Sequence, residues 1–243
     1  MKPLEPSCKR IRLREQEEYD MSKIKSNQEW LRYKKLMQER PHHFCPCNDL
    51  EIITDEILIT EYEVNTGRTI GVVYESTYRI LVVDLVYDGK SYFPYERVIP
   101  AVDTGAVVIV PIYQGRFVLL NQFRHALRDY QCAFPRGFAE KGLSAEEQCK
   151  KELREEVGCE TNRVDFLGTL VSDSGLSGDK VNVYLCEIES YEEKQGYEGI
   201  DTVIELSEDE FSKYIEEGRI DDGFSLAAYA MYISKLSNSK RSH

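Results

Sequence analysis

The hydrophobic pattern of this chain changes period near its middle, and this change limits the fold more than any other feature. Short β-branched and aromatic runs lie at 57–59, 69–74, 78–87, 106–111 and 117–123. Short polar segments with glycine, such as Asp88-Gly89 and Gln114-Gly115, separate several of them, and such segments form tight turns. In the second half, helices fit 144–157, 207–217 and 223–237, and strands fit 163–171 and 181–188. The pattern predicts an α/β fold with a mixed sheet.

Local signals sharpen several helix boundaries. Ser144 with Glu147, and Ser207 with Glu210, have the S-x-x-E spacing of a capping box. Apolar residues recur at helical spacing from Asn27 to Gln38, which predicts a short amphipathic helix.

Composition excludes several classes of protein. The 243 residues carry a formal charge of −12, which argues against a nucleic-acid-binding surface over the whole molecule. Residues 1–50 carry a net +3, and we expect a charged arm there, solvated over about its first 25 residues, followed by this short helix. No apolar run reaches the ~18–20 residues of a membrane helix, and no apolar core follows the charged N-terminus as in a secretory signal. Seven scattered cysteines, an odd number, favour the reducing cytoplasm over a disulfide framework.

The segment from Gly137 to Gly158 carries the most chemical information. On a helix, the carboxylates of Glu152, Glu155 and Glu156 share one face, where they repel one another unless a cation lies between them. Hard oxygen ligands suit Mg²⁺, with Mn²⁺ as the alternative. Gly137 opens the preceding loop, where the backbone can approach a ligand closely. The competing interpretation is a solvated acidic helix face.

This segment resembles the Nudix box, G-x5-E-x7-R-E-U-x-E-E-x-G-U, where U is aliphatic. Six positions match at fixed spacing: Gly137, Glu152, Leu153, Glu155, Glu156 and Gly158. Leu143 stands where the first Glu belongs, Lys151 where the Arg belongs, and Cys159 at the closing aliphatic position. The two changes read as one support replaced by another, with Leu143 expected to pack under the loop.

Flanking motifs resemble the ADP-ribose pyrophosphatase branch of the Nudix hydrolases. These motifs are Gln122-Phe123-Arg124, Phe134-Pro135-Arg136-Gly137 and Asp173-Ser174-Gly175-Leu176-Ser177. The resemblance implies a Nudix-type α/β/α sandwich with a mixed sheet, preceded by a small β-rich N-terminal segment. We expect the segment at 51–103, the Nudix hydrolase domain at 104–243, and a homodimer formed by exchange of the front segment.

The resemblance also assigns candidate residues. It implies that Glu152, Glu155 and Glu156, together with the backbone carbonyl of Arg136, bind metal. Glu198, in a loop after the box, would orient or deprotonate the attacking water, or it is simply an exposed loop carboxylate. Arg124 would hold phosphate or ribose, or it is a strand-end surface charge. Arg136, Gly137 and Ser174 complete the substrate side.

The expected activity is metal-dependent hydrolysis of a nucleoside diphosphate linked to another moiety, first among them ADP-ribose to AMP and ribose 5-phosphate. The alternative is a Nudix-fold module that binds a nucleotide without turning it over, which the altered box keeps open. Motifs do not rank ADP-ribose against sugar nucleotides, dinucleotides or NADH.

Other clusters favour plainer interpretations. The run from His42 to Cys47 lacks a matched second pair for a zinc site and reads as a loop, with Cys8 as a distant third thiol. Cys132, Cys149 and Cys159 read as small buried hydrophobes, and the run from Arg10 to Arg14 reads as part of a solvated arm.

Overall fold

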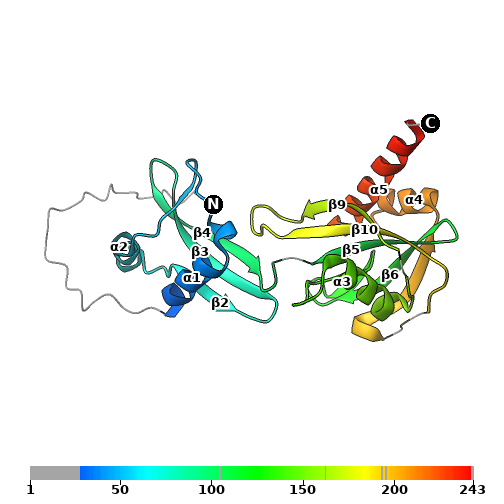
Figure 1. Ribbon diagram of the computed structural model, residues 1–243, viewed down its shortest axis with the longest axis horizontal. Coiled ribbons are helices and arrows are strands. Elements are labelled where there is room, and N and C mark those ends of the chain that lie inside the picture. Colours follow the sequence, from blue (N-terminus) through cyan, green and yellow to red (C-terminus); the bar gives the residue numbers. More distant parts are fainter. Residues whose placement is uncertain (1–27, 104, 162, 193, 195, 242–243) are drawn as a thin grey trace, which may run out of the picture. The chain divides into compact units, whose positions relative to one another are not determined.

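The computed structural model describes residues 28–103, 105–161, 163–192, 194 and 196–241. The chain divides into two compact units, an N-terminal one that ends at Ile99 and a C-terminal one that begins at Pro100, and each is described by itself (Figure 1). The expected features at Cys8 and from Arg10 to Arg14 lie outside the described residues. Within the described ranges, no helix has both the length and the apolar composition needed to cross a bilayer.

The N-terminal unit packs helices against a small sheet. Its elements are α1 (Gln28–Glu39), the 3-10 turn η2 (Pro41–Phe44), β1 (Glu51–Ile52), α2 (Glu56–Thr66), β2 (Gly71–Glu75), β3 (Arg79–Tyr87) and β4 (Tyr92–Pro100). β3 is central and pairs with β1, β2 and β4. Trp30, Tyr33 and Leu36 form the buried face of α1, one helical turn apart, and they share a core with strand residues such as Val82. The helix expected from Asn27 to Gln38 is confirmed over 28–38, and its first residue lies outside the described part of the chain.

The strand expected at 57–59 is wrong, because these residues form the first turn of α2. Asp55 caps the helix, since its side chain accepts hydrogen bonds from the backbone N–H groups of Ile57 and Leu58 at 2.9 and 3.1 Å. Gly67, at φ 69°, ends the helix in the left-handed conformation. The β-branched residues at 57–59 favour a strand, but the two caps at Asp55 and Gly67 make the segment helical.

One buried charge network lies in the N-terminal unit. Asp84, 2% exposed, accepts a short hydrogen bond from the Tyr33 hydroxyl and an ion-pair contact of 2.5 Å from Arg97 Nε. Arg97 Nη1 also donates to the His43 carbonyl oxygen at 2.8 Å. Burial, followed by the charge of Asp84, raises the pKa of Tyr33. The network joins α1, β3 and β4 through one carboxylate.

The C-terminal unit contains a seven-stranded mixed sheet in the order β11-β6-β5-β10-β9, with β7 paired to β6 and β8 paired to β5. Its strands are β5 (Val107–Tyr113), β6 (Arg116–Arg124), β7 (Asp129–Ala133), β8 (Arg136–Gly137), β9 (Asp165–Val171), β10 (Lys180–Ile188) and β11 (Ile200–Leu206). β10 runs parallel to β5, whereas the other pairs given for this sheet are antiparallel. The expected mixed sheet is confirmed.

Helices cover both faces of this sheet (Figure 1). They are α3 (Ala145–Glu152), continued by the π-type turn η3 (Leu153–Val157), and α4 (Glu208–Glu216) and α5 (Gly223–Arg241). Alternate residues of β5 face opposite ways: Val107 and Ile109 pack with Leu153, whereas Val108 and Val110 pack with Phe211 of α4. Such a strand is apolar throughout because both faces are buried. The expected α/β/α layering is confirmed.

Candidate active site

The box glycine provides the space that one box glutamate occupies. β8 places Gly137 opposite Val107 of β5, and Glu152 closes α3. A Cβ atom on Gly137 would lie 1.9 Å from Oε1 and 2.1 Å from Cδ of Glu152. Any other residue at 137 would therefore displace the Glu152 carboxylate.

The predicted helix from 144 to 157 begins as expected and then changes type. Ser144 and Glu147 form the capping box, as do Ser207 and Glu210 at α4. After Glu152 the chain makes a π-type turn, which Gly158 ends at φ 67°. Such turns recur at functional sites. Here Leu153 and Val157 enter the core, and Glu156 between them is only 3% exposed.

The buried carboxylate of Glu156 is electrostatically disfavoured as an anion. Burial, and then the negative charge of Glu152, raise the pKa of Glu156 to about 8. Its Oε2 accepts a hydrogen bond of 3.1 Å from the backbone N–H of Arg136, which partly offsets this cost. Burial also raises the pKa of Glu152, with the charges of Glu155 and Glu198 adding to the effect. The four carboxylates thus act on one another, and a cation among them would relieve their repulsion.

The two candidate arginines differ in what they contact. Arg136 Nη1 donates to Asp222 Oδ1 at 2.6 Å, and its guanidinium lies 4.8 Å from the centre of the Phe224 ring. Asp222 is itself buried and accepts from the backbone and hydroxyl of Ser225 at 2.9 and 2.7 Å. Arg124 at the end of β6, in contrast, has a buried Nε with no hydrogen-bond partner among the described residues. Its guanidinium is the freer of the two to bind an anion.

Glu198 lies in a constrained turn, η4 (Tyr197–Gly199), just before β11. Its backbone adopts φ 45°, which is uncommon for a residue with a side chain. Buried Gln122 donates from Nε2 to the Glu198 carbonyl oxygen at 2.9 Å, and the Tyr197 hydroxyl lies 3.4 Å from Glu155 Oε2. Gln122 and Tyr197 were not expected at the site. The signal that could have found them is their position in the sequence. Gln122 lies two residues before Arg124, and Tyr197 lies one residue before Glu198.

Ser174 lies on the exposed loop between β9 and β10. Neighbouring bonds in that loop are local, such as the one from the Ser177 N–H to the Asp173 carbonyl oxygen at 2.7 Å. Among the described contacts, none joins Ser174 to the carboxylates.

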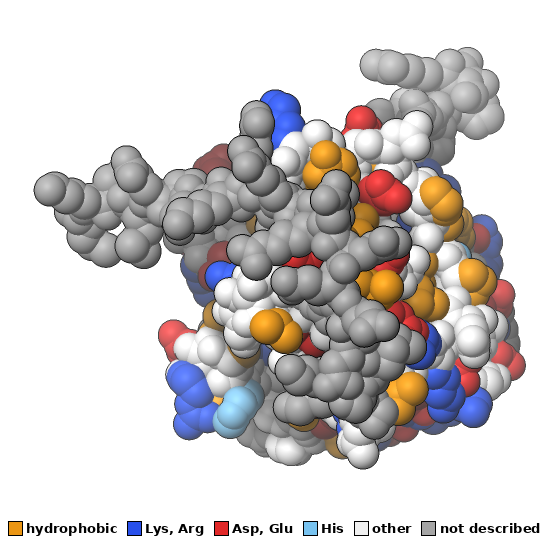
Figure 2. Space-filling model, turned by 90° about the vertical axis from the view of Figure 1, so that its left-hand side faces the viewer, with side chains coloured by type: hydrophobic (Ala, Val, Ile, Leu, Met, Phe, Trp, Pro, Cys, Tyr) orange, Lys and Arg blue, Asp and Glu red, His pale blue; other side chains and the backbone are white. Residues whose placement is uncertain are grey.

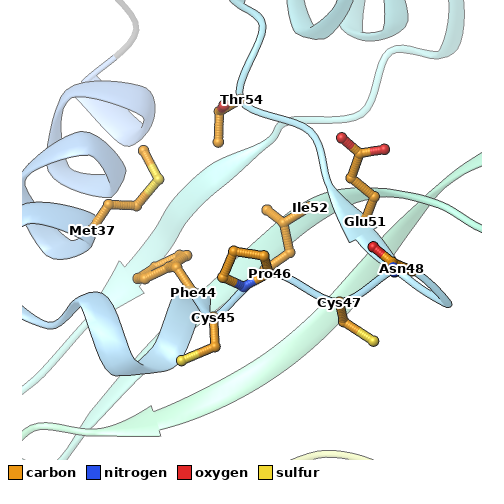
Figure 3. A pocket seen from close by; sticks show the side chains of 9 residues that line it. All are labelled: Met37, Phe44, Cys45, Pro46, Cys47, Asn48, Glu51, Ile52 and Thr54. Atoms are coloured by element: carbon orange, nitrogen blue, oxygen red, sulfur yellow. The ribbon is translucent and has the colours of Figure 1, made fainter.

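The cysteine-containing loop of the N-terminal unit lines a cavity of about 480 Å³ (Figure 3). Met37, Phe44 and Ile52 supply apolar walls, and the exposed thiols of Cys45 and Cys47 point to different sides. Cys132, Cys149 and Cys159 are buried as expected, and burial raises the pKa of each thiol.

Exposed apolar residues of the N-terminal unit include Ile57 and Val64, both on α2. On the face drawn in Figure 2, orange apolar side chains alternate with charged ones in the coloured area. Scattered exposure of this kind is ordinary for a protein surface.

Comparison with known proteins agrees with this geometry. Residues 103–215 match the family model described as the NUDIX domain. This match confirms the resemblance of that part of the chain to the Nudix hydrolases.

Three relatives are similar to parts of the chain. The chain is 30% identical over 105 residues to the ADP compounds hydrolase NudE of Escherichia coli (strain K12), covering 43% of this chain and 56% of the relative. It is 30% identical over 114 residues to the ADP-ribose pyrophosphatase of Bacillus subtilis (strain 168), covering 46% and 57%. A third relative, the methanol dehydrogenase activator of Bacillus methanolicus, is 28% identical over 130 residues, covering 51% and 69%. The chain thus spans little more than half the length of the first two.

A solved structure of an ADP compounds hydrolase has the same fold. It superposes with a TM-score of 0.61 at 22% identity and covers 71% of this chain and 94% of that chain.

Proposed function

We propose that the C-terminal unit hydrolyses a nucleoside diphosphate linked to another moiety, and that ADP-ribose, cleaved to AMP and ribose 5-phosphate, is the first substrate to test. The observation that carries this proposal is the buried carboxylate of Glu156, next to Glu152 and held by the backbone of Arg136. A solvated acidic face would not bury one of its acids. The names of the relatives, an ADP compounds hydrolase and an ADP-ribose pyrophosphatase, support the substrate class.

The donor set fits a hard divalent cation, Mg²⁺ first and Mn²⁺ second. Glu152, Glu155 and Glu156, together with the Arg136 carbonyl, would hold it, and only glycine at 137 leaves room for the Glu152 carboxylate. When bound, the cation would neutralise charge on the diphosphate and acidify the attacking water.

The protein's own groups supply the remaining functions. Glu198 orients the attacking water and accepts its proton, and the Gln122 hydrogen bond to its carbonyl oxygen fixes that loop. Arg124 binds a phosphate oxygen through its guanidinium, which suits anions of this shape. The water oxygen forms a bond to one phosphorus as the bond to the bridging oxygen breaks, which leaves one phosphate group on each product.

The test is a phosphatase-coupled assay of phosphate release with Mg²⁺ on ADP-ribose, sugar nucleotides, dinucleotides and NADH, with an EDTA control. We expect at least one compound to be hydrolysed, and Glu198→Gln to reduce its turnover by about 100-fold or more. Failure to hydrolyse any of them, with calorimetric binding of one, would overturn the hydrolase.

That outcome would favour the second candidate, a nucleotide-binding regulatory module. Two observations keep it in view. Leu143 and Lys151 depart from the box, and one relative is named an activator of another enzyme.

We further propose the domain boundaries 51–103 and 104–243, a cytoplasmic location and a homodimer formed through the N-terminal segment. The six cysteines among the described residues are free thiols, which suits a reducing compartment. Light scattering of the purified protein would test the dimer.

A further inference from the structure

The substituted lysine of the box forms two ion pairs. Lys151 Nζ lies 2.7 Å from Glu140 Oε1, in the loop, and 2.9 Å from Glu155 Oε2, one turn further along the helix. Glu140 is three residues before Leu143, where the box pattern has its first acid. An acid is therefore present in the loop, but at another position.

A second contact within the box holds the other candidate ligand. Gln148 is one turn before Glu152 and is 0% exposed. Its Nε2 donates to Glu152 Oε1 at 2.5 Å and lies 3.5 Å from the same Glu140 oxygen that Lys151 contacts. The box pattern leaves position 148 open, so no motif points to this glutamine.

The two contacts differ in strength. The Lys151 pair with Glu140 is partly exposed, with side-chain exposures of 31% and 48%, and solvent weakens such pairs. The bond from Gln148 is part-buried, starts from a side chain with no exposure and ends on a carboxylate, which makes it the stronger of the two. Gln148 is therefore the residue whose loss matters most to carboxylate geometry.

We propose that Gln148 positions Glu152 and Lys151 positions Glu155, with Glu140 joining both to the loop, and that this set replaces the box acid absent at Leu143. The inference rests on the proposed function, since it assigns these residues to the metal-binding carboxylates. Gln148 and Lys151 are positioning residues and not catalytic ones.

The test uses Gln148→Met in the full chain, because methionine has a similar length but cannot donate. Mn²⁺ binding is measured by electron paramagnetic resonance, alongside kcat, KM and Tm. We expect Mn²⁺ affinity to fall about 10- to 100-fold while KM at saturating metal changes little. Glu146→Gln is the matched control, since exposed Glu146 lies on the same helix and pairs with Lys150 among the described contacts. It should leave Mn²⁺ affinity unchanged.

Lys151 gives an independent measurement if Gln148→Met unfolds. Lys151→Met should weaken Mn²⁺ binding, whereas Lys151→Arg, which keeps the positive charge, should bind Mn²⁺ as wild type does. Wild-type Mn²⁺ affinity in folded Gln148→Met, or in Lys151→Met, overturns the inference. A wild-type protein that binds no Mn²⁺ and hydrolyses nothing overturns the proposed function, and the inference with it.

Discussion

The carboxylate of Glu152 occupies the space that a side chain at Gly137 would fill. A Cβ atom there would meet Oε1 at 1.9 Å, a separation that no pair of non-bonded atoms tolerates. The obstructing atom is the end of a flexible side chain, so the carboxylate can move without unfolding the sheet. Gly137 and Glu152 therefore form one unit, in which the glycine fixes the position of the acid.

Replacing Gly137 with alanine should separate activity from stability. The new methyl group pushes the Glu152 carboxylate away, so we expect turnover to fall by about 100-fold or more while Tm changes by only about 3 °C. Steady-state kinetics and calorimetric unfolding measure the two effects. Gly142→Ala is a poor control because its φ is +91°, so Gly178→Ala, with open space around it, is the better one. Equal turnover in Gly137→Ala and wild type would contradict the geometry.

Glu156 should make the metal-free protein less stable as pH rises. Its folded pKa of about 8 lies above its ordinary value of 4.5, so its contribution to stability is complete below pH 4.5 and is lost as pH rises through 8. Glu156→Gln lacks this loss. In EDTA, the variant should equal wild type near pH 4.5 and exceed its Tm by about 5–10 °C near pH 8.5.

Bound metal should remove the Tm advantage that Glu156→Gln has over wild type in EDTA. Added Mg²⁺ should raise the Tm of wild type more than that of Glu156→Gln, which lacks one of the ligand charges. Turnover of the variant should fall by about two or more powers of ten. Identical Tm profiles for the two proteins in EDTA would show that Glu156 ionises normally.

Arg124 should contribute to substrate binding more than to metal binding. Its Nε is buried without a described partner, whereas Arg136 is already paired with Asp222. Arg124→Lys keeps the charge but loses the planar donors, so we expect kcat/KM to fall about 10- to 100-fold, mainly through KM. Mn²⁺ affinity should not change. Arg154→Lys, exposed and paired with Glu160, is the control, and an equal effect of both changes would exclude a specific role.

Local signals in the sequence predicted the parts of this site that depend on near neighbours. The capping serines at 144 and 207 start their helices where expected, because a cap is made within four residues. The pairing of Arg136 with Asp222 joins positions 86 apart, and only the folded sheet and α5 bring them together. The short strand β8 was likewise missed, since two residues carry no period. The role of Gln148 could not be predicted from the sequence, because its amide contacts Glu152 only through the packing of the fold and no spacing pattern marks position 148.

The N-terminal unit should depend on Asp84. Arg97 and Tyr33 both donate to its carboxylate, and Asp84→Asn would leave the guanidinium without its counter-charge. We expect a loss of about 3–5 kcal/mol in unfolding free energy, measured by urea titration. Glu56→Gln, which breaks the exposed pair with Lys34, should cost less than about 1 kcal/mol. A similar small cost for both variants would contradict the role assigned to the buried network.

We expect the natural protein to be active despite the two departures from the box at Leu143 and Lys151. Lys151 already pairs with Glu140 at 2.7 Å. A second acid at 143 would therefore compete with Glu140 for the Lys151 ammonium group. Leu143→Glu alone should therefore change turnover by less than about 100-fold, the range of residues that only orient ligands. Leu143→Glu combined with Lys151→Arg rebuilds the box pattern and should stay within the same range across a Mg²⁺ titration. A gain of roughly three powers of ten in the double variant would exceed that range. Such a gain would mean that the natural box is impaired and would favour the nucleotide-binding module over the hydrolase.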